Sequence, residues 1–219
     1  MKSVAMSFQE YLDRPIAGWS RPLIAVAAFL LLIPFVSPLW RISMKAPQYP
    51  EGLRLDIYCY KLDAGHDGAD LAEINILNHY IGMRKILRED LADLDWLPFA
   101  LGVLFLLALR VALIGNIRSL VDLSVLSSYM ALVALGRFVY QLYSYGHDLS
   151  PDAPMDMEPF TPAIIGTKQV ANFTTTSLPR GGGTAIGAFV TLMALLTLGL
   201  LWQGRRKARA RLAARAAEQ

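Results

Sequence analysis

Four long apolar segments alternate with more polar stretches along the chain, and this pattern predicts how the protein is organised. The apolar segments cover residues 23–40, 97–115, 123–145 and 184–202. Each is close to the roughly 20 apolar residues that a helix needs to cross a hydrocarbon layer of about 30 Å. We therefore predict an all-α membrane protein with four transmembrane helices.

The first apolar segment is predicted to be an uncleaved membrane anchor. It is longer than the roughly 7–15 apolar residues of a signal peptide, and no pair of small residues suited to cleavage follows it. In the preceding segment, residues 1–22, Ser7 and Glu10 have the spacing of a helix capping box, and Pro15 ends the pattern. We expect a short amphipathic helix on the membrane surface there.

The distribution of lysine and arginine predicts the orientation of these helices. Basic residues are concentrated in the tail, residues 203–219, and also occur in residues 1–22 and 116–122. Because Lys- and Arg-rich segments stay on the cytoplasmic side, we expect a multi-pass protein of the bacterial inner membrane with both termini in the cytoplasm. The tail directly follows an apolar segment, so we expect anionic lipids of the bilayer, and not nucleic acid, as its partner.

The two remaining segments, residues 41–96 and 146–183, are then predicted to be periplasmic loops. In the first loop, apolar and polar residues alternate over 53–62, which predicts a strand. An apolar stripe then predicts a helix that Asp70 caps and Gly82 ends. The stripe consists of Leu71, Ile74, Leu77 and Ile81, and a second short helix with inward-facing leucines is expected over residues 87–94.

The second loop has a different composition. It contains Pro151, Pro154, Pro159 and Pro162, which prevent a regular helix or strand from running through it. Its apolar side chains indicate that it packs on the first loop rather than being disordered. We therefore expect the two loops to form a small mixed α/β cap outside the membrane.

The composition excludes a soluble globular enzyme. Hydrophobic residues make up 54% of the chain and charged residues 18%, whereas soluble domains have roughly 45–50% and about 25%. Cys59 is the only cysteine, so neither an internal disulfide nor a cysteine-based zinc site is expected. The sequence contains no P-loop and no GxSxG motif, and we expect no enzymatic activity.

Histidines and methionines in the predicted periplasmic loops suggest a copper site. Imidazoles and thioethers are both copper ligands, and thioethers favour Cu(I). The predicted ligands are His79, Met83, His147, Met155 and Met157. The first two are four residues apart on the predicted helix and share a face. An alternative interpretation stays open, because methionines commonly fill gaps in hydrophobic cores and a histidine on a helix more often makes a hydrogen bond.

Two arginines fall within the predicted transmembrane segments. Arg110 lies near the cytoplasmic end of its segment, where its side chain can reach the interface. Arg137 lies deeper, and tyrosines follow it. Charges inside a membrane commonly face a helix interface or a polar cavity, so Arg137 is compatible with helix packing, with a bound lipid headgroup or with a cavity for a small solute or quinone.

Several motifs in the loops resemble those of a protein family. The motifs are APQYPEGL at 46–53, LNHYIGM at 77–83, and YGHDLSP, IIGTKQVANF and SLPRGGG within 145–183. They resemble an uncharacterised family of small bacterial multi-span inner-membrane proteins thought to accompany gene clusters for nitrous-oxide reductase, a copper enzyme. The resemblance implies a role near that enzyme and provides no catalytic residues. Its motif positions are Asn78, His79, Tyr80, Met83, Gly146, His147, Lys168, Asn172 and Phe173.

These observations lead to three hypotheses. The first is an accessory protein that binds or relays copper for a periplasmic cuproenzyme or a membrane maturation complex. The second is a non-catalytic anchor or scaffold subunit of a respiratory or transporter complex, which would expose an apolar patch. The third is a component that handles a small solute or quinone through Arg137. It would have to form an oligomer, because four transmembrane helices are few for a transporter.

Overall fold

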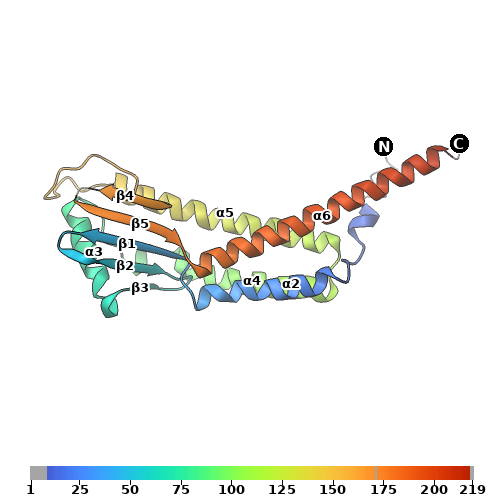
Figure 1. The fold of residues 1–219 in the computed structure, drawn as a ribbon, viewed down its shortest axis with the longest axis horizontal. Helices are drawn as coiled ribbons and strands as arrows, with labels where there is room; N and C mark the ends of the chain where they lie inside the picture. The colour runs from blue at the N-terminus through green and yellow to red at the C-terminus, as the bar shows by residue number, and fades with distance from the viewer. Residues whose placement is uncertain (1–8, 171, 218–219) are drawn as a thin grey trace. The chain divides into compact units, whose positions relative to one another are not determined.

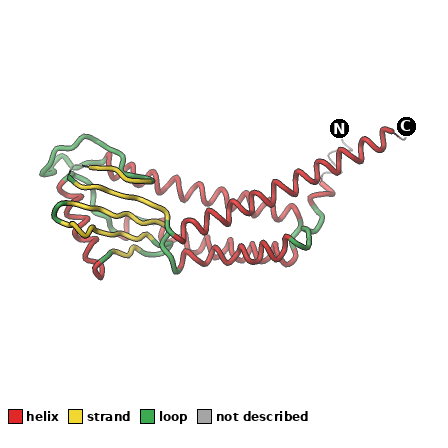
Figure 2. The backbone as a smooth tube through the Cα atoms, in the orientation of Figure 1, coloured by secondary structure: helices red, strands yellow, loops and turns green. Residues whose placement is uncertain are grey.

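The computed structural model describes residues 9–170 and 172–217, which form two compact units (Figures 1 and 2). The helical unit contains the described residues of 1–32, 102–131 and 187–219, and the sheet unit contains those of 33–101 and 132–186. Three long helices, α4, α5 and α6, contribute residues to both units. The elements are α2 (Ser20–Ala28), η1 (Phe29–Phe35), β1 (Trp40–Ala46), β2 (Tyr49–Ile57), β3 (Leu62–Ala64), η2 (His66–Gly68), α3 (Ala69–Tyr80), η3 (Arg88–Asp90), α4 (Asp93–Ile114), α5 (Ile117–His147), β4 (Gly166–Val170), β5 (Phe173–Pro179) and α6 (Gly181–Ala217).

Within the described residues, three helices, and not the predicted four, are long and apolar enough to cross a membrane. They are α4, α5 and the part of α6 from Gly181 to Ala210. The first apolar segment forms only a shorter helix, Ser20–Phe35, and its last part is the 3-10 helix η1, which contains Pro34. Proline lacks the backbone N–H that a longer helix needs, and Trp40 is already the first residue of β1. The prediction of four transmembrane helices is therefore wrong.

The prediction of an all-α protein is also wrong, because the sheet unit contains a five-stranded antiparallel sheet. The strand order is β3-β2-β1-β5-β4. Strand β1 pairs with β2 from the same loop and with β5 from the second loop, so Arg41 lies opposite both Asp56 and Leu178. The two loops thus share one sheet, and the four prolines between residues 151 and 162 all precede strands β4 and β5.

The predicted strand over 53–62 corresponds to β2, which begins earlier, at Tyr49, and ends at Ile57. A turn in which the Tyr58 N–H donates to the carbonyl oxygen of Lys61 (2.9 Å) follows β2. The second short helix expected near 87–94 is only the 3-10 turn η3, and α4 begins soon after it, at Asp93.

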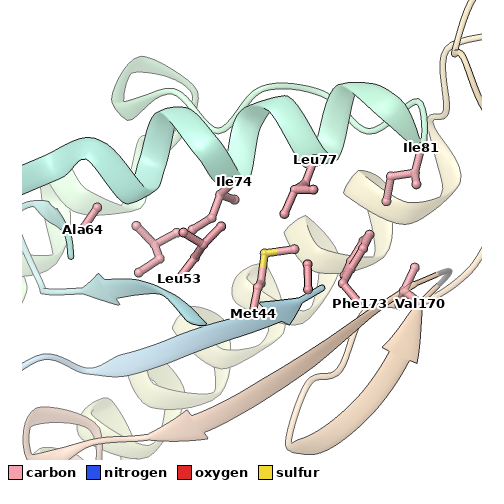
Figure 3. Close-up of a cluster of buried hydrophobic side chains, with 10 residues drawn as sticks. Met44, Leu53, Ala64, Ile74, Leu77, Ile81, Val170 and Phe173 are labelled. Carbon is pink, nitrogen blue, oxygen red and sulfur yellow. The ribbon is translucent and has the colours of Figure 1, made fainter. Parts of the chain in front are cut away.

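Helix α3 covers one face of the sheet, and the core of the sheet unit lies between them (Figure 3). The predicted stripe on α3 is largely confirmed, because Ile74, Leu77 and Ile81 are buried and Leu71 packs against them. The sheet contributes Met44, Ala46, Leu53, Leu55, Ala64, Val170 and Phe173. The helix begins one residue after Gly68, which has a left-handed backbone (φ 96°), so Asp70 lies inside the helix and is not its cap.

In the helical unit, the described N-terminal residues form hydrogen bonds with α5 and α6. Ser7 of the predicted capping box lies outside the described residues. The N–H of Ile117, the first residue of α5, donates to the carbonyl oxygen of Arg14 (3.0 Å). The Tyr11 hydroxyl donates to the carbonyl oxygen of Leu200 in α6 (2.8 Å). The N-terminal segment therefore connects the α4–α5 turn with α6.

Consecutive glycines allow the start of α6 to lie directly against the chain that follows η1. The Gly182 N–H donates to the carbonyl oxygen of Pro38 (3.0 Å). A Cβ atom at Gly182 would lie 2.5 Å from the carbonyl oxygen of Ser37, whereas one at Gly187 would meet nothing within 4 Å. Backbone-to-backbone contact therefore requires a glycine at position 182.

Replacing Gly182 by alanine should destabilise the sheet unit by about 1–3 kcal/mol, because the backbone at Ser37 has to move to admit the methyl group. Gly187→Ala is the matched control, and it should be neutral or slightly stabilising because its Cβ has space and alanine favours the helix. Unfolding of both variants in detergent, followed by circular dichroism, measures the difference. Equal stability of the two variants would contradict the close contact.

Candidate functional site

Backbone hydrogen bonds hold the two motif segments 78–83 and 146–160 side by side in the sheet unit. The Ser150 N–H donates to the carbonyl oxygen of Gly82 (2.8 Å), and the Met155 N–H donates to that of Tyr80 (3.0 Å). Gly82 has a left-handed backbone (φ 80°), and a Cβ atom there would lie 3.1 Å from the Ser150 carbonyl oxygen. Segments far apart in the sequence, which contain all five predicted metal ligands, are thus neighbours in the fold.

His79 lies on the last turn of α3 and is exposed. Its imidazole makes no hydrogen bond with any residue in the described ranges, and its ring centroid is 6.5 Å from that of Tyr80. The preceding residue, Asn78, is buried, and its side-chain Nδ2 has no hydrogen-bond partner among the described residues. The ring nitrogens of His79 are therefore not engaged by any other described residue.

His147 is the last residue of α5, and its ring orientation is fixed. Its Nδ1 atom lies 2.9 Å from the carbonyl oxygen of Tyr143, and the two rings stack with centroids 3.7 Å apart and planes 18° apart. A carbonyl oxygen only accepts hydrogen bonds, so Nδ1 carries the proton. In neutral His147 the free lone pair is then on Nε2, the atom that would bind a metal.

The three predicted methionine ligands differ in their surroundings. Met83 and Met157 are partly buried and pack against the core between α3 and the sheet. Met155 is exposed, with 38% of its surface accessible. The packing of the first two agrees with the alternative that methionines fill gaps in a core, which leaves Met155 as the accessible thioether.

No group of three or more His, Cys, Asp or Glu side chains in the described part of the chain is placed to hold a metal ion. Cys59 is buried, its thiol donates to the carbonyl oxygen of Pro34 (3.3 Å), and burial raises the pKa of the thiol to about 11. Such a thiol is a poor metal ligand, because the thiolate is the binding form. A copper site at the paired segments would consist of imidazoles and thioethers.

The structure also gives His66 and Asp70 a role that the sequence did not reveal. Asp70 is buried, and its carboxylate accepts hydrogen bonds from the backbone N–H of Arg54 (2.7 Å) and from Nδ1 of His66 (2.6 Å). The hydrogen bond and the negative charge of Asp70 raise the pKa of His66. This pair joins β2 to the start of α3 and leaves His66 outside the paired segments.

Arg137 has a partner that its position in the sequence does not suggest. Its Nε atom lies 2.5 Å from Oδ1 of Asp93, at the start of α4, and the same carboxylate oxygen accepts from the Trp96 indole N–H (2.8 Å). The ion pair gives Arg137 a structural role between α5 and α4.

No family model, no curated protein and no solved structure matches the chain. The structure itself defines the class: over its described residues, the protein has three helices long and apolar enough to span a membrane, and a five-stranded antiparallel sheet packed on α3.

The His66–Asp70 pair predicts a pH-dependent contribution to stability. Because the pKa of His66 is raised in the folded state, the contribution is fully present below the ordinary histidine pKa of about 6.5 and is lost as the pH rises through the higher folded value. In Asp70→Asn, an NMR titration should show the pKa of His66 moving back towards its ordinary value. Asp63→Asn, which removes a carboxylate that does not contact His66, should leave it raised. An unchanged His66 pKa in Asp70→Asn would contradict the assignment.

Proposed function

We propose that the protein is an inner-membrane accessory protein that binds copper on the paired segments 78–83 and 146–160 and passes it to a periplasmic cuproenzyme such as nitrous-oxide reductase. One observation carries the proposal: the backbone hydrogen bonds from Ser150 and Met155 bring the loops with His79 and His147 together. The resemblance of the loop motifs to proteins that accompany copper-enzyme genes supports the same function.

The chemistry of the segments suits transfer better than storage. The proposed ligands are His79, Nε2 of His147 and the thioether of Met155, which lie at or near the surface. Neutral imidazoles and thioethers are uncharged ligands that suit Cu(I), and an accessible ion can move to a partner by ligand exchange. The buried Cys59 takes no part in this proposal.

The proposed orientation places the paired segments in the periplasm. The basic residues of the α6 tail and of the α4–α5 turn favour the cytoplasm for those parts. With α4, α5 and α6 as the spans, the α4–α5 turn and the α6 tail are then cytoplasmic, and the segments that precede α4 and follow α5 face the periplasm.

A Cu(I)-loading experiment tests the copper proposal. Purified full-length protein in uncharged detergent is loaded anaerobically with Cu(I), desalted and analysed for metal. The double variant His79→Ala/His147→Ala should lose the copper that the wild type retains, because it lacks both imidazoles. His66→Ala is the matched control, since the third histidine binds Asp70 and lies outside the segments. Equal retention by the double variant and the control would overturn the proposal.

A scaffold role is the second candidate, and the outer surface of α3 favours it. Ile76 and Tyr80 are both exposed and lie one helical turn apart on the same face. Exposed apolar side chains outside the candidate membrane spans suggest a partner protein.

A photo-crosslinking amino acid at Ile76 tests the scaffold role in intact cells. A scaffold should give a discrete adduct of higher mass with or without copper in the medium, because its partner binds this face permanently. The control position is Tyr60, which is exposed in the turn between β2 and β3. Adducts of the same pattern from both positions, or from neither, would contradict a specific partner at this face.

A further inference from the structure

A polar hollow of about 460 Å³ lies where β1, β5 and α6 meet in the sheet unit. Its lining includes Ser37, Arg41, Arg180 and Thr184, together with Gly181 and two prolines. None of the lining residues is acidic. The copper proposal does not use any of them.

The walls of the hollow are held in place by backbone contacts. The Arg180 N–H donates to the carbonyl oxygen of Leu39 (3.0 Å), and the Gly182 N–H donates to that of Pro38 (3.0 Å). A Cβ atom at Gly181 would lie 2.5 Å from Oγ of Ser37. The absence of a side chain at Gly181 therefore leaves the Ser37 hydroxyl against the start of α6.

Arg41 and Arg180 provide the charge. Arg41 is oriented by Asp56, which accepts from Nε (2.6 Å) and Nη2 (2.7 Å), so its Nη1 group stays available. The same carboxylate lies 3.5 Å from the Arg54 guanidinium, so one negative charge is shared between two arginines. The exposed Arg180 side chain forms no ion pair or hydrogen bond with any described residue. The hollow thus has an excess of positive charge.

The hydroxyl groups add further hydrogen-bonding capacity. The Ser37 hydroxyl makes no hydrogen bond within the described ranges, and that of Thr184 donates to the carbonyl oxygen of Gly181 (3.1 Å). Two guanidinium groups and a free hydroxyl thus surround one hollow. These groups can donate hydrogen bonds to the oxygens of a phosphate.

The position of the hollow indicates where a phosphate group would come from. The candidate membrane span of α6 begins at Gly181, which lines the hollow. Phospholipid headgroups lie directly outside the hydrocarbon layer that such a span crosses. We propose that the hollow binds a phosphate group, with the headgroup of an anionic phospholipid or a soluble phosphate as its source.

Titration calorimetry on the full-length protein in uncharged detergent tests this site, with short-chain phosphatidylglycerol and inorganic phosphate as separate probes. Arg180→Gln should weaken binding of the occupying probe about tenfold, the loss typical of one charged hydrogen bond. Arg180→Lys, which keeps the charge but not the planar fork, should bind with intermediate affinity. Lys45→Gln is the control, because it removes an exposed positive charge from β1 outside the hollow.

The two probes separate the two sources. A lipid headgroup is supported if Arg180→Gln, but not Lys45→Gln, loses binding of phosphatidylglycerol and if inorganic phosphate does not compete for the site in the wild type. The same loss with inorganic phosphate supports a soluble phosphate. The basic tail also attracts anionic lipid, but all variants share it, so only the difference between Arg180→Gln and Lys45→Gln counts. Equal affinities of these two variants for both probes would overturn the proposal.

Discussion

The pairing of β1 with β5 is the constraint on which the rest of the sheet unit depends. It joins Trp40 to Pro179 at one end and Lys45 to Thr174 at the other, and it connects the two long segments between the apolar helices. Without it, the strands of the first loop and those of the second loop would not share one sheet. The same pairing puts Met44 and Phe173 into one core under α3, and it brings Arg41 and Arg180 to one hollow.

The sequence predicted the elements whose signal is local, and it failed where pairing decides the structure. The long apolar helices α4, α5 and α6 and the buried stripe of α3 follow from composition and period. The segment 23–40 has the same composition, but Pro34 and the pairing of Trp40 in β1 end its helix early. Strand β5 is rich in threonine and lacks strong alternation of apolar and polar residues, so only its partner β1 reveals it.

For the candidate site, the sequence identified the segments better than the surroundings of each side chain. It chose two motifs that hydrogen bonds do hold together. It could not separate Met155 at the surface from Met157 against the core, because both have the same local pattern. The partners of Asp70 and Arg137 lie on other elements, and no local spacing in a single sequence indicates such contacts.

The order of the strands also has a consequence for biosynthesis. Strand β1 is central in the sheet, yet its partner β5 is translated only after α4 and α5 are complete. Until then β1 lacks the partner for one of its edges, and an open edge can pair with other chains. Contacts between residues so far apart form late and slowly. A chaperone that covers this edge, or rapid insertion of the last helix, would prevent such pairing before the sheet closes.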